Sequence, residues 1–222
     1  MFGEALIPLL LTLKVAGFAT AAALLLGTAY GFWLARRAVP GRDLFDAIGT
    51  LPMVMPPTVL GYYLIVVIGR RGWLGEWLHD AFGVSLMFTW QGAVIASAVV
   101  AFPLVFKSAR AAFEGVDRQL EGAARTLGAS ETRVFVRVTL PLAWRGILAG
   151  TMLAFARAMG EFGATLMVAG NIPGRTQTLS LAVYDAVQAG RDDMANFLVA
   201  VTSIVCIAIL VGAGKLLRQR HA

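Results

Sequence analysis

A short basic segment between two long apolar stretches has the composition of a protein-binding surface. It combines an acid, a base and small side chains in the order Glu121-Gly122-Ala123-Ala124-Arg125-Thr126-Leu127-Gly128. Small residues let another backbone approach closely, and charged residues can pair with opposite charges on a partner. After Gly128 and nine intervening residues, the chain continues with Val138-Thr139-Leu140-Pro141. We therefore expect this segment to press against another protein.

A second charged pair lies inside an apolar stretch. Arg157 and Glu161 are four residues apart, which places them on one face of a helix. Ionisable groups inside a membrane are costly and usually face a bundle interior or an aqueous cavity. Two interpretations remain open. Either the charges neutralise each other and hold the helix in register, or Arg157 and the backbone near Gly160 and Gly163 lie on the route of an anion.

Prolines interrupt another apolar stretch, Leu51-Pro52-Met53-Val54-Met55-Pro56-Pro57-Thr58. Each proline removes a backbone donor, and its ring clashes with the preceding turn, so a helix here must be kinked or interrupted. Inside a membrane, irregular backbone is tolerated only where protein or a water-filled cavity covers it. We interpret Pro52, Pro56, Pro57 and Thr58 as candidates for lining a transport path, with a purely structural kink as the alternative.

The composition indicates a membrane protein. Hydrophobic residues make up 58% of the 222 residues and charged residues 14%, whereas globular proteins have about 25% charged residues. Most of the apolar surface must therefore face lipid or neighbouring helices. The length suits one membrane domain. The single Cys206 lies inside an apolar run and is expected to be a packing residue.

Five stretches are long and apolar enough to cross a bilayer, which takes about 20 helical residues. They are residues 7–34, 47–68, 84–106, 146–170 and 194–214. The first is too long for the apolar core of a signal peptide and follows no basic residue, so we expect a permanent helix. The sequence therefore predicts an all-α integral membrane protein with about five transmembrane helices.

The Lys and Arg residues indicate the orientation in the membrane. Thirteen of the 19 lie in the loops after the first and third stretches and in the tail, whereas four lie on the opposite side. This excess predicts an external N-terminus and a cytoplasmic C-terminus. The net charge of +6 then faces anionic headgroups and a cytoplasmic partner, so it needs no nucleic acid to explain it.

Two of the apolar stretches carry small residues at four-residue intervals. These are Gly27, Gly31 and Ala35 in the first, and Gly146, Gly150, Ala154 and Ala158 in the fourth. Membrane helices pack closely through such residues. Packing within one subunit is the plainer interpretation, and a role in a dimer interface or in sliding between transport states is the alternative.

Other chemistries lack their characteristic residues. No Gly-x-x-x-x-Gly-Lys-Ser/Thr loop is present, so the chain is not expected to bind ATP phosphates in the usual manner. His79 and His221 are far apart and have neither cysteines nor clustered acids beside them, so no metal site is expected. We expect no catalytic residues in this chain.

The basic segment resembles the coupling loop of ABC-importer permeases, whose pattern is Glu-Ala-Ala, three residues, Gly, nine residues and Ile-x-Leu-Pro. Ala123, Ala124 and Gly128 match, and Leu140-Pro141 closes the motif, whereas the family's acidic position holds Gly122. The resemblance implies a permease domain over residues 7–214 that contains a cytoplasmic coupling loop at 111–141. Its ATPase-coupling residues would be Glu121, Ala123, Ala124, Arg125, Gly128, Leu140 and Pro141.

Nearly the whole chain resembles type I ABC-importer permeases of the molybdate branch. The resemblance extends to Pro57-Thr58-Val59-Leu60-Gly61-Tyr62-Tyr63, Gly69-Arg70-Arg71-Gly72, Gly160-Glu161-Phe162-Gly163-Ala164-Thr165 and Asn171-Ile172-Pro173-Gly174. The Gly-Glu-Phe-Gly type of segment is shared with sulfate permeases. From the proline break and the charged pair described above, the pathway candidates are Pro52, Pro56, Pro57, Thr58, Arg157, Gly160, Glu161 and Gly163.

The resemblance implies a homodimeric permease in the bacterial inner membrane, with two cytoplasmic ATPase subunits that bind ATP and a periplasmic oxyanion-binding protein. The expected function is uptake of molybdate or tungstate, with no cofactor and no enzymatic activity on this chain. A sulfate or thiosulfate permease is the alternative. A stand-alone channel or secondary transporter would explain the spans but not the coupling loop, and a membrane scaffold would not explain the prolines.

Overall fold

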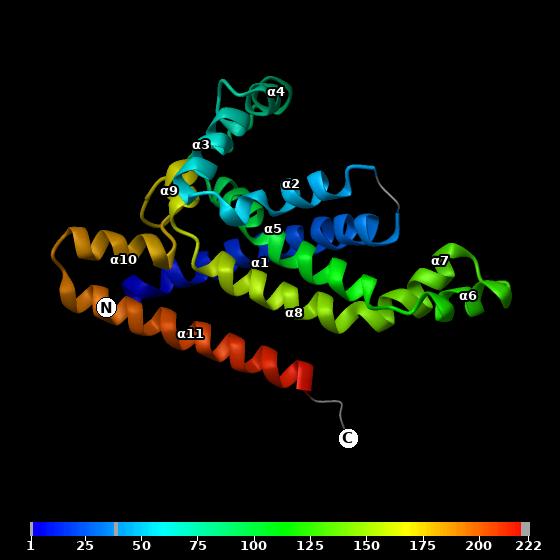
Figure 1. The fold of residues 1–222 in the computed structure, drawn as a ribbon. Helices are drawn as coiled ribbons and strands as arrows, with labels where there is room; N and C mark the ends of the chain where they lie inside the picture. The colour runs from blue at the N-terminus through cyan, green and yellow to red at the C-terminus, as the bar shows by residue number, and fades with distance from the viewer. Residues whose placement is uncertain (1, 38–39, 219–222) are drawn as a thin grey trace.

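The computed structural model describes residues 2–37 and 40–218, and every regular element in this part of the chain is a helix (Figure 1). In chain order the elements are α1 (Phe2–Arg36), α2 (Arg42–Val54), α3 (Pro57–Ile68), α4 (Trp73–Phe82), α5 (Trp90–Glu114), α6 (Arg118–Thr126), α7 (Glu131–Val134), the π-helical turn η1 (Phe135–Thr139), α8 (Leu140–Met159), α9 (Gly163–Ala169), α10 (Leu179–Gln188) and α11 (Asp192–Arg218). The all-α prediction is confirmed.

Four helical runs in the described residues are long and apolar enough to cross a membrane. They are Gly3–Arg36, Trp90–Glu114, Glu131–Met159 and Asp192–Gly212. A fifth span is added if α2 and α3 are counted together as one broken span. The structure is therefore consistent with the expected number of about five transmembrane helices.

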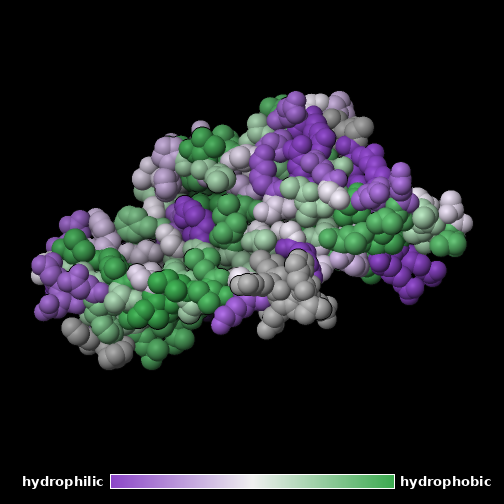
Figure 2. All heavy atoms as spheres, turned by 60° about the horizontal axis from the view of Figure 1, so that its bottom comes forward, coloured by the Kyte–Doolittle hydropathy of each residue, from purple (hydrophilic) through white to green (hydrophobic). Residues whose placement is uncertain are grey.

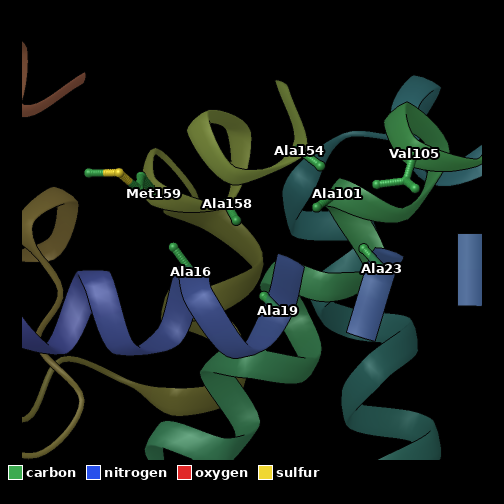
Figure 3. Packing of buried hydrophobic residues seen from close by; sticks show 8 residues of the cluster. All are labelled: Ala16, Ala19, Ala23, Ala101, Val105, Ala154, Ala158 and Met159. Carbon is green, nitrogen blue, oxygen red and sulfur yellow. The ribbon is translucent and has the colours of Figure 1, made fainter. Parts of the chain in front are cut away.

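Helix α5 forms the centre of the bundle and packs against both α1 and α8 (Figure 1). One buried cluster joins the three helices through small side chains (Figure 3). Its members are Ala16, Ala19, Ala23, Ala101, Val105, Ala154, Ala158 and Met159. Alanine dominates this cluster because, between membrane helices, close van der Waals packing replaces the hydrophobic driving force.

Glycines bring α1 and α8 onto α5. A Cβ atom added to Gly150 would lie 2.4 Å from Ser108 Cβ, and one added to Gly27 would lie 3.0 Å from Val105 Cβ. A side chain at Gly150 would force its neighbours to move, and one at Gly27 would be tighter than most Cβ contacts, so glycine allows the close approach at both positions. The two rows of small residues thus pack the chain against itself, which is the plainer of the two interpretations.

The second apolar stretch is broken as the prolines predict. Helices α2 and α3 meet at an angle of 112°. Residues that precede a proline are driven out of the helical region, and both Met55 and Pro56 are extended, with ψ of 143° and 137°. Pro57 then opens α3 at its first position, where no N–H is required. Pro52, in contrast, lies inside α2.

The fourth expected range, 146–170, is two helices in the structure, because α8 ends at Met159 and α9 begins at Gly163. At its other end, α8 continues through η1 back to Glu131, within the loop expected at 111–141. Pro141 has no N–H to donate to the Arg137 carbonyl four residues earlier. The wider turn of η1 accommodates this missing hydrogen bond without ending the helix.

The third expected range, 84–106, also differs from the helix that the structure places there. Helix α5 begins at Trp90, where the Thr89 hydroxyl accepts a hydrogen bond from the Gly92 amide at 3.2 Å. It ends at Glu114, about two turns beyond the expected limit. The first and fifth expected ranges lie inside α1 and α11.

Apolar side chains cover much of the outer surface. Figure 2 shows broad hydrophobic patches in green, with hydrophilic groups in purple gathered between and beside them. Leu25, Val54 and Ile204 are 72%, 78% and 66% exposed. Exposed apolar patches of this extent mark a surface that meets lipid or other subunits.

Candidate coupling site and transport path

The segment between α5 and α8 folds as a helical hairpin that projects from one end of the bundle (Figure 1). Asp117 caps α6 by accepting a hydrogen bond from the Gln119 amide at 2.8 Å. Ser130 caps α7 in the same way, accepting from the Arg133 amide at 3.4 Å. Two separately capped helices thus flank one tight turn.

Gly128 makes the turn of this hairpin. Its φ of +81° lies in the left-handed region, which glycine enters without steric cost. The Gly128 amide donates to the Arg125 carbonyl at 2.9 Å, and the Ala129 amide to the Ala124 carbonyl at 3.1 Å, which ends α6 in a glycine C-cap. Leu127 is 88% exposed at the tip. The hairpin therefore presents an apolar tip beside small residues.

Glu121 points into the protein, not towards a partner. It is only 5% exposed, and its Oε1 atom accepts hydrogen bonds from Arg36 Nη2 at 2.7 Å and from Thr139 Oγ1 at 2.6 Å. The Arg125 guanidinium lies 3.9 Å from Oε2. Glu121 consequently ties α6 to α1 and η1, and it is the least accessible of the expected coupling residues.

The other expected coupling residues are more accessible. Ala123, Arg125, Gly128 and Pro141 are exposed, while Ala124 and Leu140 are partly buried. Arg125 also forms a two-pronged ion pair with Glu131, at 2.6 Å and 3.1 Å. This hydrogen bonding raises the pKa of the Arg125 guanidinium above its usual value, so Arg125 stays charged on the hairpin surface. The structure thus places five of the seven residues in the projecting hairpin, while Leu140 and Pro141 open α8.

An ionic cluster between α2 and α5 was not anticipated from the sequence. Asp46 pairs with both Arg110 and Lys107, the latter at 2.5 Å, and Glu114 pairs with Arg110 at 2.9 Å and with Arg42. Lys107, Arg110 and Glu114 recur every three or four residues, which puts them on one face of α5. That spacing was the available signal, but the partners on α2 are more than 60 positions away in the chain.

The pathway candidates lie at or near two helix breaks that pack against each other. The first break is between α2 and α3, and the second is between α8 and α9. A Cβ atom added to Gly163 would be 2.7 Å from Pro57 Cβ, and one added to Gly61 would be 2.6 Å from Met167 Cβ. The α2–α3 break therefore packs on the start of α9. Pro56, Pro57 and Thr58 are exposed at this junction, and Pro52 is partly buried.

Arg157 and Glu161 form an ion pair at this second break. Arg157 Nη1 lies 2.9 Å from Glu161 Oε2, and the side chains are 39% and 1% exposed. Glu161 Oε1 also accepts a hydrogen bond from the Ala164 amide at 3.0 Å. The carboxylate thus joins the end of α8 to the first turn of α9 across Gly160, which supports the structural interpretation of the pair.

No group of three or more His, Cys, Asp or Glu side chains among the described residues is arranged to hold a metal ion. The two sites contain backbone turns, ion pairs and packing contacts. A bundle of apolar spans with a paired helix break and a projecting hairpin is the architecture of a multi-pass membrane protein.

Residues 23–221 match the family described as binding-protein-dependent transport system inner membrane component. The chain belongs to this family, and it is a multi-pass inner-membrane permease subunit rather than an enzyme.

Known permease proteins are similar over most of the chain. The molybdenum transport system permease protein ModB of Escherichia coli K12 is 47% identical over 204 residues, covering 91% of this chain and 89% of the relative. The putative molybdenum transport system permease protein YvgM of Bacillus subtilis is 44% identical, covering 91% and 87%. The sulfate transport system permease protein CysW of Synechocystis is 36% identical, covering 88% and 71%.

Solved structures share the fold. An inward-facing structure of the MetNI methionine ABC transporter aligns with a TM-score of 0.75 at 17% identity, covering 98% of this chain and 96% of the other. A bacterial ABC transporter that imports alginate aligns with the same TM-score at 16% identity, covering 98% and 80%. These similarities establish a type I ABC-importer permease fold.

Proposed function

We propose that this chain is the membrane-spanning subunit of an ATP-driven importer of molybdate or tungstate. The observation that carries the proposal is the 47% identity over 91% of the chain to a molybdenum transport permease. The sulfate permease named above is 36% identical. A sulfate or thiosulfate permease is therefore the second candidate.

The complex that we propose contains two copies of this chain, two cytoplasmic ATPase subunits and a periplasmic oxyanion-binding protein. ATP binds to the ATPase subunits, and this chain supplies the path through the membrane. The hairpin is placed to receive the movement of the ATPases, because its tip is exposed and its two arms lead into spanning helices. Excess Lys and Arg on the hairpin side support a cytoplasmic location.

The connections of the hairpin explain how its movement would reach the path. Helix α7 continues through η1 into α8 without interruption. The hydrogen bonds of Glu121 add α1 to the same unit. At the other end of α8, Gly163 contacts Pro57. A displacement of the hairpin would therefore alter the contact between the two helix breaks, where Pro57, Thr58, Gly160 and Gly163 are candidates for the path.

Reconstituted transport tests the proposal. The permease, its ATPase and its binding protein would be placed in proteoliposomes, and uptake of radioactive molybdate would be measured with and without ATP. We expect uptake that requires ATP, is unaffected by a tenfold excess of sulfate, and is reduced by tungstate. Competition by sulfate would instead favour the second candidate, and uptake without the ATPase would contradict an ABC importer.

The orientation is tested separately with reporter fusions. A cytoplasmic reporter such as green fluorescent protein should be active when it is fused after Ala222. An alkaline phosphatase fusion that is active at the same position would overturn the orientation and the cytoplasmic location of the hairpin.

A further inference from the structure

A cavity of about 980 Å³ lies between the end of α1, the hairpin and the beginning of α8. It is at the upper end of the size range of small-molecule sites in proteins, about 300–1,000 Å³. The residues that line it come from α1, α6, α7, η1 and α8. The exposed tip residue Leu127 and the turn residue Gly128 are not among them. Three of the expected coupling residues, Glu121, Arg125 and Leu140, do line it, so the cavity borders the segment expected to contact the ATPase and only the tip itself lies outside.

The lining is apolar at one end and basic at the other. The apolar part is formed by side chains of α1, η1 and α8, namely Leu24, Leu25, Ala29, Phe32, Phe135 and Ile147. The basic part includes Arg36 and Arg37 at the end of α1 and Arg118 at the start of α6. From Leu24 to Arg37 the helical rise is about 20 Å. The cavity thus extends from the apolar span towards the charged membrane surface.

The charges of the lining leave a net positive site. Four guanidinium groups and two carboxylates line it. Arg36 is paired with Glu121, and Arg125 with Glu131. Arg37 and Arg118 are exposed and have no acidic partner among the described residues. Two cations therefore remain free to bind an anion at the mouth.

Two buried polar atoms in the lining are also without a hydrogen-bond partner in the part of the chain that the structure describes. They are Arg36 Nε and Thr28 Oγ1, both on the α1 side of the cavity. Buried polar groups are normally hydrogen-bonded, so these atoms indicate where a ligand oxygen is accommodated.

We propose that this cavity binds an anionic phospholipid of the cytoplasmic leaflet. The phosphate is held between Arg37 and Arg118, and the glycerol backbone reaches towards Thr28 and Arg36. The acyl chains lie along Leu24, Leu25 and Ala29. Basic pockets between spanning helices at the cytoplasmic side are a recognised type of lipid headgroup site.

A lipid fits these observations better than a free oxyanion or a protein does. A small inorganic anion would bind at the basic end and leave the apolar half of the lining without a ligand. A protein partner is expected at the hairpin tip, which lies outside the cavity. The site rests on the cytoplasmic location of the hairpin and not on the transported substrate. A negative result from the fusion at Ala222 or from the lipid measurement would therefore leave the proposed molybdate uptake untouched. Failure of molybdate uptake would likewise leave the lipid site untouched.

Binding is measured by native mass spectrometry of the intact complex of permease and ATPase, titrated with dimyristoyl phosphatidylglycerol or with phosphatidylcholine. We expect one phosphatidylglycerol molecule to be retained per permease chain, with no equivalent retention of phosphatidylcholine. The Arg37→Gln/Arg118→Gln variant should bind at least about tenfold more weakly, since each basic residue near an anionic lipid contributes about 1 kcal/mol.

The matched control is Arg133→Gln/Arg137→Gln, which removes the same number of charges from residues that do not line the cavity. It should bind phosphatidylglycerol as the wild type does. Equal loss in both variants would overturn the site, because only the general surface charge would then matter. Displacement of the lipid by millimolar inorganic phosphate would show an ion site without lipid selectivity and would overturn the proposal. Retention of the lipid by the isolated permease but not by its complex with the ATPase would also overturn it.

Discussion

Glu121 and Glu161 are buried to a similar extent, 5% and 2% exposed, but they connect different parts of the molecule. Glu121 binds Arg36, which is 85 positions away in the chain, and Thr139, which is 18 positions away. Glu161 binds Arg157 and the amide of Ala164, four and three positions away. One carboxylate joins separate helices, and the other joins two ends of an interrupted helix.

This difference indicates how the two ends of the bundle work. At the hairpin, the carboxylate links α1, α6 and η1, so in the proposed mechanism a displacement of the tip would reach several helices. At the break, the carboxylate fixes a local geometry and leaves the contact between Gly163 and Pro57 to packing. In the proposed mechanism, the hairpin is the end that receives the ATPase movement, and the break, with its packed Gly163 and Pro57, is the candidate path.

The largest expected effect is at the hairpin turn. Gly128→Glu should leave the protein in the membrane and abolish transport, because a charged side chain at the turn prevents docking and the left-handed φ strains any side chain. Gly128→Ala shares the strain without the charge, and it should retain more uptake. Copurification of the ATPase and uptake by cells are the measurements. Wild-type values of both for Gly128→Glu would contradict the docking role.

The next largest effect is on thermal stability, and it should differ between a buried and an exposed carboxylate of the same hairpin. Glu121→Gln removes the charge that Arg36 needs, and breaking a buried pair typically costs about 3–5 kcal/mol. Glu131→Gln is the control, because the Glu131 side chain is 76% exposed. Thermal unfolding of the purified permease should reveal a clear decrease for the first variant and almost none for the second. Equal decreases would contradict the structural role of Glu121.

A double-mutant cycle tests the pair at the break. Arg157→Ala leaves the buried Glu161 carboxylate without its cation, so the single variant should be less stable than Arg157→Ala/Glu161→Ala. Uptake should recover together with stability in the double variant. If stability returns while uptake stays low, Arg157 lies on the anion route, and the structural interpretation of the pair is wrong.

The smallest effect concerns glycine packing. Gly150→Ala adds a methyl group only 2.4 Å from Ser108 Cβ, and such overpacking costs about 1–3 kcal/mol. Gly122→Ala meets nothing within 4 Å and should stabilise α6 by up to about 1 kcal/mol, the difference in helix propensity. Thermal unfolding of both variants compares the two sites, and destabilisation by Gly122→Ala would contradict the description of the hairpin.

Local chemistry made part of this architecture predictable. Pro56 and Pro57 restrict their own backbone and that of the preceding residue, so the break between α2 and α3 follows from the sequence alone. The coupling loop inferred from the resemblance at 111–141 stays a prediction, and the structure folds this segment as α6, α7 and η1. The small-residue rows predicted close packing, and the structure supplied the partner helix.

Other features depend on contacts that the sequence cannot display. The inward direction of Glu121 is set by Arg36, 85 positions away. The interruption after Met159 was missed because the glycines at 160 and 163 sit in an apolar run, where a glycine costs a helix only about 1 kcal/mol. The extension of α8 through η1 depends on a wider turn ahead of Pro141, whereas a proline more often marks the end of a helix.

Site-directed crosslinking tests the central claim most directly, namely that the tip of the hairpin contacts the ATPase. A photoactivatable crosslinker would be attached to Leu127→Cys in a chain that carries Cys206→Ser, since Cys206 is the single cysteine of the sequence. Trp73→Cys is the control, because Trp73 is 71% exposed but belongs to α4, away from the hairpin. The account predicts a permease–ATPase product from position 127 and none from position 73. A product from position 73 alone would contradict it.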